Sequence, residues 1–355
     1  MKTFLKKSLF RLLIFLVLLT LVFFIRLPRS YYFSIPEKTD FSKMTWIENK
    51  LNTTESFDNT IVFVGSSICF NGINDSLLNA WDTTSTQYLN LGITHTCYAI
   101  VDAMLENIII DRKLHPKKVM LCFKGDAMAR NIHNMYSLVA DSEQILESAT
   151  DGNMLFVPSF LKRASWNTHA LTHYFKRDEG NEKERFVSNY GFDPQRMRDS
   201  IEVEKIYTRL KAGSEANFNS IEHEAKGGPQ SLKLRLLLTK IDYMENIKFQ
   251  RKSFERSAAL LDKYGIDYDI MLYPNLVSAR MEKSFLMADY IKRTFTGIDY
   301  NRHKVIAVTD PEFKNASLYV DMNHLNPTGA NKLSKYVYDI LNPSISAIEE
   351  FPVQQ

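Results

Sequence analysis

Cysteine is scarce in this sequence, with only Cys69, Cys97 and Cys122 among 355 residues. Three cysteines without metal-ligand spacing exclude a disulfide-built scaffold and a cysteine-based zinc site. All three are expected near the ends of strands, where cysteine serves as a small buried apolar residue. If the domain is exported, one disulfide with one free thiol is the alternative.

A surplus of charge of one sign is also absent, because 44 basic residues nearly balance 41 acidic ones. The net charge of +3 gives no reason to expect a nucleic-acid partner. No glycine-rich phosphate loop is present, and the histidines lack metal-ligand spacing. His169 and His173 are four residues apart, but no Glu stands beside His169 as in the zinc-protease pattern. We therefore expect neither a cofactor nor a metal.

Residues 1–30 contain no acidic residue and carry a long apolar run. Leu12–Ile25 is apolar except for Thr20, and Leu9 and Phe10 extend the run beyond Arg11. It covers roughly 17 positions, the lower limit for a helix that crosses a bilayer. Lysines in front of it favour a cytoplasmic amino terminus, and no small-x-small cleavage pattern follows it. We predict an uncleaved signal anchor; a cleaved signal peptide and a buried helix are the alternatives.

Five short apolar runs have the character of parallel strands buried on both faces. They are Ile61–Val64, Tyr88–Leu91, Val119–Phe123, Tyr268–Tyr273 and Lys304–Val308. Helical patterns lie between and after them, at Ala99–Asp111, Ser231–Tyr264, Ala279–Thr294 and Pro327–Leu341. This alternation predicts an α/β fold with a doubly wound, parallel, five-stranded sheet.

The predicted α/β domain covers residues 59–345 and follows a spacer with a short helix at 31–58. Residues 130–228 interrupt its rhythm with polar, aromatic and charged stretches. We interpret them as a partly helical insertion between the third and fourth strands, of a kind that often shapes the substrate side of a site.

Two serines stand where the first predicted strand ends. The run Ile61–Val64 leads into Gly65, Ser66 and Ser67, so a serine lies where a strand turns into a helix. Ligands bind at this edge of open α/β sheets, and free N–H groups at a helix amino end can stabilise an oxyanion. A serine nucleophile is one interpretation, and a simple helix cap is the other.

A carboxylate and a histidine follow the last predicted strand. Asp321 and His324 share a short loop immediately before the helix at Pro327–Leu341. Serine is a weak nucleophile unless a base takes its proton, and histidine suits that role because it titrates near neutral pH. A carboxylate can hold the tautomer and orientation of that histidine. The alternative is a surface histidine beside a capping Asp.

Taken together, these motifs resemble the SGNH, or GDSL-like, hydrolase superfamily. The resemblance covers roughly residues 60–126 and 265–341. The Gly-Ser-Ser run is similar to the first family block, Asn90-Leu91-Gly92 to the second, and Asp321 with His324 to the last. It implies Ser67 as the nucleophile, in a triad with His324 and Asp321. It also implies that the N–H groups of Ser67 and Gly92 belong to an oxyanion hole.

The third block departs from the family pattern, which places an Asn in the oxyanion hole after the third strand. Here Asp126 occupies roughly that place. An ionised carboxylate would repel the developing oxyanion, so Lys124 or Asn131 are the alternative donors. Loss of one donor typically raises the barrier by about 2.7–4 kcal/mol. A slow enzyme or an inactive relative is therefore a second interpretation.

The anchor combined with these motifs resembles single-pass SGNH proteins that accompany membrane-bound O-acyltransferases in bacteria, such as the D-alanylation protein of teichoic acid export and the alginate acetylation proteins. The resemblance implies an extracytoplasmic serine esterase or O-acyltransferase acting on acyl esters, above all acetyl esters, of cell-surface glycans. Its expected partners are the acylated glycan, the membrane and an integral-membrane O-acyltransferase. The alternative is an inactive scaffold of such an acyltransferase.

Overall fold

The computed structural model describes residues 2–25, 44, 47, 50–54, 56–93, 96–110, 112–123, 133–150, 156–176, 251–274, 276, 279, 291–293, 295–319 and 324–343. At its centre lies an all-parallel, five-stranded sheet with the strand order β2-β1-β3-β4-β5. The strands are β1 (Thr60–Gly65), β2 (Gln87–Asn90), β3 (Lys118–Phe123), β4 (Tyr268–Leu272) and β5 (Val305–Ala307). All five predicted strands are confirmed, and each end lies within one residue of its expected position.

Alternate residues of each strand face opposite cores. In β1, Val62 and Val64 belong to one buried cluster, whereas Ile61 and Phe63 belong to the other. Because both faces are covered, each strand reads as a continuous apolar run and not as an alternation of apolar and polar residues. This double burial explains why the strands could be located from composition alone.

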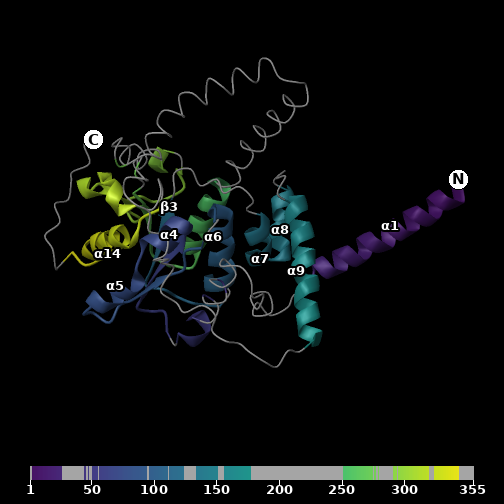
Figure 1. The fold of residues 1–355 in the computed structure, drawn as a ribbon, viewed down its shortest axis with the longest axis horizontal. Coiled ribbons are helices and arrows are strands. Elements are labelled where there is room, and N and C mark those ends of the chain that lie inside the picture. Colours follow the sequence, from purple (N-terminus) through teal and green to yellow (C-terminus); the bar gives the residue numbers. More distant parts are fainter. Residues whose placement is uncertain are drawn as a thin grey trace, which may run out of the picture.

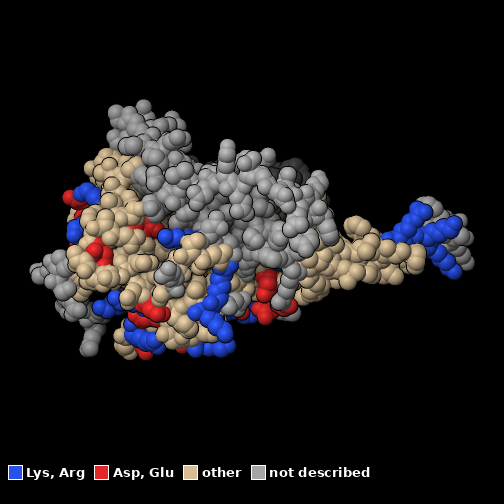
Figure 2. Space-filling model, turned by 90° about the horizontal axis from the view of Figure 1, so that it is seen from below, with Lys and Arg blue, Asp and Glu red and all other residues tan. Residues whose placement is uncertain are grey.

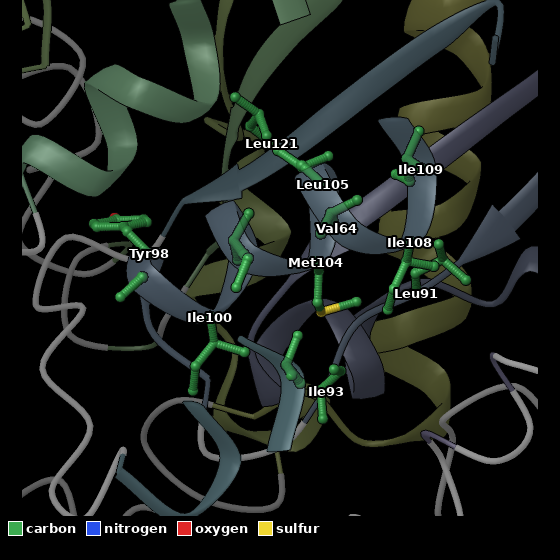
Figure 3. Close-up of a cluster of buried hydrophobic side chains, with 14 of the residues drawn as sticks. Val64, Leu91, Ile93, Tyr98, Ile100, Met104, Leu105, Ile108, Ile109 and Leu121 are labelled. Atoms are coloured by element: carbon green, nitrogen blue, oxygen red, sulfur yellow. The ribbon is translucent and has the colours of Figure 1, made fainter. Parts of the chain in front are cut away.

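The first core lies beneath helix α6 (Tyr98–Met104), which continues as a π-helical turn at Leu105–Ile110. In Figure 3, Ile100, Met104 and Ile108 come from one face of this helix, at the four-residue spacing that aligns helical side chains. They pack with Val64 of β1 and with Leu91, which directly follows β2. The predicted helix at Ala99–Asp111 is therefore confirmed over its described residues.

The second core lies on the opposite face of the sheet. It is covered by α4 (Ser67–Gly72), α5 (Asp75–Trp81) and α14 (Pro327–Leu341). Helix α14 has the predicted bounds, because Asn326 caps it by accepting the Gly329 N–H at 3.0 Å and Pro327 stands at its first position.

The exposed edge of the sheet at β2 is covered by side chains at and after α5. Three polar side chains of α5 and the residue after it accept backbone N–H groups of β2 and the residue before it, at 2.8, 2.8 and 3.0 Å. The pairs are Asp75 with Asn90, Asn79 with Tyr88, and Asp82 with Thr86. Asp75 and Asn79 are four helical residues apart, a rise of about 6 Å, which is close to the roughly 6.6 Å between their partners Asn90 and Tyr88. The two spacings match, and the edge is closed to pairing with another chain.

The described part of the predicted insertion consists of α7 (His133–Val139), α8 (Ser142–Thr150) and α9 (Phe156–Lys176). Buried residues of these helices, such as Tyr136 and Ile145, join the core on the α6 side. Asn107 of the π-helical turn donates to Gln144 of α8 at 2.8 Å and to the Val139 carbonyl at 3.2 Å. These helices therefore lie on the face of the sheet opposite α4, and Figure 1 shows them beyond α6; residues 177–228 of the predicted insertion lie outside the described residues.

Helix α1 (Lys2–Phe23) leaves the body as an isolated rod (Figure 1). Among the described residues, no helix combines the length and apolar character needed to cross a membrane.

Two other predicted elements are described in part. Residues 251–263 are helical, as expected for the end of Ser231–Tyr264, whereas most of Ala279–Thr294 lies outside the described residues.

In the predicted spacer, Met44, Ile47 and Leu51 follow helical spacing and are buried in the α6-side core. This part of the spacer thus belongs to the domain it precedes.

Candidate active site

The two predicted loops meet at the carboxyl edge of the sheet. The Ser67 Oγ lies 2.8 Å from the His324 Nε2, although 257 positions separate the two residues in the chain. Both side chains are partly exposed, so a substrate can reach them. This distance is within the reach that a nucleophile and its general base require.

Ser67 owes its place to the tight end of β1. A Cβ added at Gly65 would lie 2.6 Å from the Cys122 Cβ, so only glycine allows β1 and β3 to approach this closely. Ser66 then takes the extended N-cap position of α4, and Ser67 is the first residue of that helix. The strand order reverses between β1 and β3, where open α/β sheets form their ligand crevice.

The structure also distinguishes the two serines. Ser66 makes no side-chain capping bond, and its carbonyl accepts the Phe70 N–H at 2.9 Å. Ser67 is the one that faces His324.

The loop that carries His324 is closed by its own backbone. Tyr319 and Leu325 form an antiparallel bridge, and the Asn326 N–H donates to the Leu318 carbonyl at 2.9 Å. The Asn326 side chain also donates to the Ser317 carbonyl at 2.5 Å. These contacts hold the start of α14 against the loop, so His324 projects from a braced turn.

Helices α4 and α14 are joined directly. The Asn74 backbone N–H, just after α4, donates to the Ser334 Oγ at 2.8 Å, and its side-chain amide donates to Asn331 at 3.2 Å. These bonds tie the helix that begins at Ser67 to the helix that follows His324. No sequence pattern pointed to them, because the partners are far apart in the chain.

Asn90 organises the second family-like block. Its amide nitrogen donates to the carbonyls of Cys69 and Ile73 at 2.9 and 2.8 Å, and it is fully buried. Its oxygen accepts the Gly92 N–H at 2.9 Å. Gly92 lies against α4, since a Cβ there would be 2.5 Å from the Phe70 nitrogen. The N–H predicted to serve the oxyanion hole therefore donates to a neighbouring side chain, a contact that the sequence did not indicate.

Two thiols and one phenol lie together in the core on the α4 side. Cys69, Cys97 and Cys122 are all buried and free, as expected, but Cys97 stands at the N-cap of α6 in the opposite core. The Tyr273 hydroxyl donates to the Cys122 Sγ at 3.5 Å, and burial raises the pKa of both groups well above their usual ranges. Cys122 and Tyr273 therefore favour their neutral forms, and Cys122 lies against Gly65, two residues before Ser67.

The remaining predicted site residues fall outside the described residues. They are Asp321, the third member of the proposed triad, and Asp126, Lys124 and Asn131 after β3. Within the part of the chain that the structure describes, no three His, Cys, Asp or Glu side chains gather as metal ligands would.

Comparison with models of known protein families and with curated protein sequences finds no match to this chain.

Proposed function

We propose that this protein is an extracytoplasmic SGNH-type serine esterase or O-acyltransferase, acting on acyl esters, above all acetyl esters, of cell-surface glycans. The observation that carries the proposal is the 2.8 Å approach of the Ser67 Oγ to the His324 Nε2 at the carboxyl edge of a parallel sheet. The choice of glycan esters rests on the motif resemblance and on the anchor.

In the proposed reaction, His324 takes the Ser67 hydroxyl proton on Nε2, which requires the tautomer with a proton on Nδ1. The Ser67 oxygen attacks the acyl carbonyl, and backbone N–H groups at the start of α4 face the resulting oxyanion. His324 then returns the proton to the departing alkoxide, leaving an acyl-serine. Water or a glycan hydroxyl, deprotonated by His324, attacks this ester and releases Ser67. On the basis of the motif resemblance, Asp321 is assigned the role of orienting His324.

Membrane attachment is assigned to α1. Eleven large apolar side chains between Leu9 and Phe24 are exposed, most of them by more than half of their surface. Figure 2 shows Lys and Arg side chains gathered at the free end of this rod and an uncharged remainder. Exposed apolar surface on this scale calls for a nonaqueous partner. Because the apolar run of α1 is at the short limit for a span, Arg11 would have to snorkel toward the cytoplasmic headgroups for the α/β domain to lie on the other side.

Labelling with a serine-directed fluorophosphonate tests the nucleophile. Wild-type protein should be labelled at Ser67, and Ser67→Ala should lose both the label and the hydrolysis of a small acetyl ester. Ser66→Ala is the matched control, because the Ser66 side chain caps nothing, and it should retain both. Unchanged turnover in Ser67→Ala would remove the assignment.

A second function, an inactive SGNH-fold scaffold of a membrane-bound O-acyltransferase, is favoured by one observation. The Gly92 N–H is occupied by Asn90, so this candidate oxyanion donor would have to leave a buried bond to act. A folded protein that captures no fluorophosphonate at Ser67 but copurifies with an integral-membrane acyltransferase would support this function over the first.

A further inference from the structure

Exposed large apolar side chains are confined almost entirely to two neighbouring helices. Of the fourteen in the described residues, eleven lie between Leu9 and Phe24, and two, Val157 and Leu161, lie on α9. The last is Tyr264, on the body. The two on α9 are 60% and 51% exposed, and their i, i+4 spacing puts them on one face. Ser159, Arg163 and Ala170, on the other side of α9, are buried.

Helix α1 ends on α9. The Phe23 ring packs on Phe160 with ring centroids 4.4 Å apart, and Phe23 is fully buried. Asn167 donates to the carbonyls of Val22 and Phe23 at 2.7 and 3.0 Å, and Ser142 of α8 donates to Phe23 at 2.9 Å. The last carbonyls of a helix normally need water or caps. Here side chains of the body cap two of them, the Val22 and Phe23 carbonyls.

Helix α9 is in turn fixed to the body. Arg163 is buried and donates to the carbonyls of Ser137 and Leu138 at the end of α7, at 3.3 and 3.5 Å. The α1–α9 junction is therefore a packed joint, and α1 cannot swing without breaking it. In Figure 1, α9 runs across the base of the rod formed by α1.

From this geometry we propose that the Val157–Leu161 face of α9 lies in the headgroup region of an anionic bilayer, and that α1 and α9 together hold the catalytic domain in one orientation on the membrane. The inference rests on the membrane attachment of the proposed function and adds a second contact to it. A helix that runs across the base of a membrane-normal helix lies along the bilayer surface. Its exposed residues Val157 and Leu161 flank Phe160, which packs on Phe23 of α1, and the exposed Lys162 beside Leu161 suits anionic headgroups.

Fluorescence quenching in vesicles tests this contact. Full-length protein carrying Leu161→Cys, Leu16→Cys or Tyr264→Cys is labelled with an environment-sensitive dye, with wild type as the blank because its cysteines are buried. Each protein is reconstituted into phosphatidylcholine–phosphatidylglycerol vesicles that contain no other protein. Lipids with a quencher near the headgroup, or deep in the chain, are then added.

We expect the label at position 161 to shift to shorter wavelength and to lose most of its emission to the shallow quencher. The label at 16 should respond to the deep quencher, and the label at 264, on an exposed site of the body, to neither. A label at 161 that behaves like the one at 264, while 16 is quenched, overturns the α9 contact and leaves the anchor intact. A response at 161 that is strongest for the deep quencher overturns the surface position. Silence at both 16 and 161 overturns the anchor and this inference together.

Discussion

Asn90 holds Gly92 and the end of the nucleophile helix at the same time. Its Oδ1 accepts the Gly92 N–H at 2.9 Å, while its Nδ2 donates to the carbonyls of Cys69 and Ile73. The helix that begins at Ser67 is thus fastened to the loop after β2 by one buried amide. Asn90 touches no reacting atom in the proposed reaction, so its role is to position.

Removing this amide should cost stability. In Asn90→Ala the Cys69 carbonyl keeps the Ile73 N–H, but the Ile73 carbonyl and the Gly92 N–H lose the Asn90 side chain, and each such group costs about 1–3 kcal/mol. We expect the free energy of unfolding, measured with urea, to fall by at least about 2 kcal/mol. Asn301→Ala, at an exposed position, is the matched control and should stay within about 0.5 kcal/mol. Equal effects of the two substitutions would show that the Asn90 bonds are not needed.

The braced loop before α14 gives a second prediction. A Cβ at Gly329 would lie 2.3 Å from the Leu318 carbonyl oxygen, whereas nothing lies within 4 Å of one at Gly297. Gly329→Ala must push the loop that carries His324 away from α14, at a cost of about 1–3 kcal/mol. Thermal unfolding should show this loss, and fluorophosphonate labelling of Ser67 should slow. Gly297→Ala should change neither; a stable, fully reactive Gly329→Ala would contradict the close contact.

Elements with a local signature could be predicted from the sequence. The strands are continuous apolar runs because both faces of the sheet are buried, and α14 begins where Asn326 and Pro327 signal a start. The meeting of Ser67 and His324 followed from placing both loops at the carboxyl edge of a parallel sheet.

Contacts between distant polar side chains had no such signature. The clamp of Asn90 and the pairing of Asn107 with Gln144 both depend on which residues folding brings together. The sequence also did not show that α7–α9 lie on the α6 face of the sheet. Their amphipathic pattern indicates that one face of each helix is buried, but it does not indicate which element covers that face.

A buried ion pair joins α6 to the helix at 251–263. Asp102 is fully buried and accepts Arg256 Nε at 2.5 Å and the Ser257 hydroxyl at 3.2 Å. Arg256→Met would leave this carboxylate without its cation, which typically costs about 3–5 kcal/mol. Arg251→Met, on the same helix, breaks an exposed pair with Glu255 and should cost less than about 1 kcal/mol. Urea unfolding of both variants compares them, and similar losses would refute a special role for the buried pair.

The same carboxyl should make stability depend on pH. Burial raises the pKa of Asp102 from its ordinary 3.8 to about 6, although the Arg256 guanidinium opposes the shift. The folded state therefore binds this proton more tightly than the unfolded chain. The contribution of the protonated Asp102 to the free energy of unfolding is complete below pH 3.8 and is lost as the pH rises through about 6. The contribution is on the order of 3 kcal/mol.

The test compares the unfolding free energies of wild type and Asp102→Asn across this pH range. The difference between them should change by this contribution from one end of the range to the other, and wild type should gain relative to the variant at the acid end. Asp58→Asn, at an exposed carboxyl, should follow wild type throughout. A wild-type advantage that grows with pH would mean that Asp102 is held ionised by Arg256 and that pairing outweighs burial.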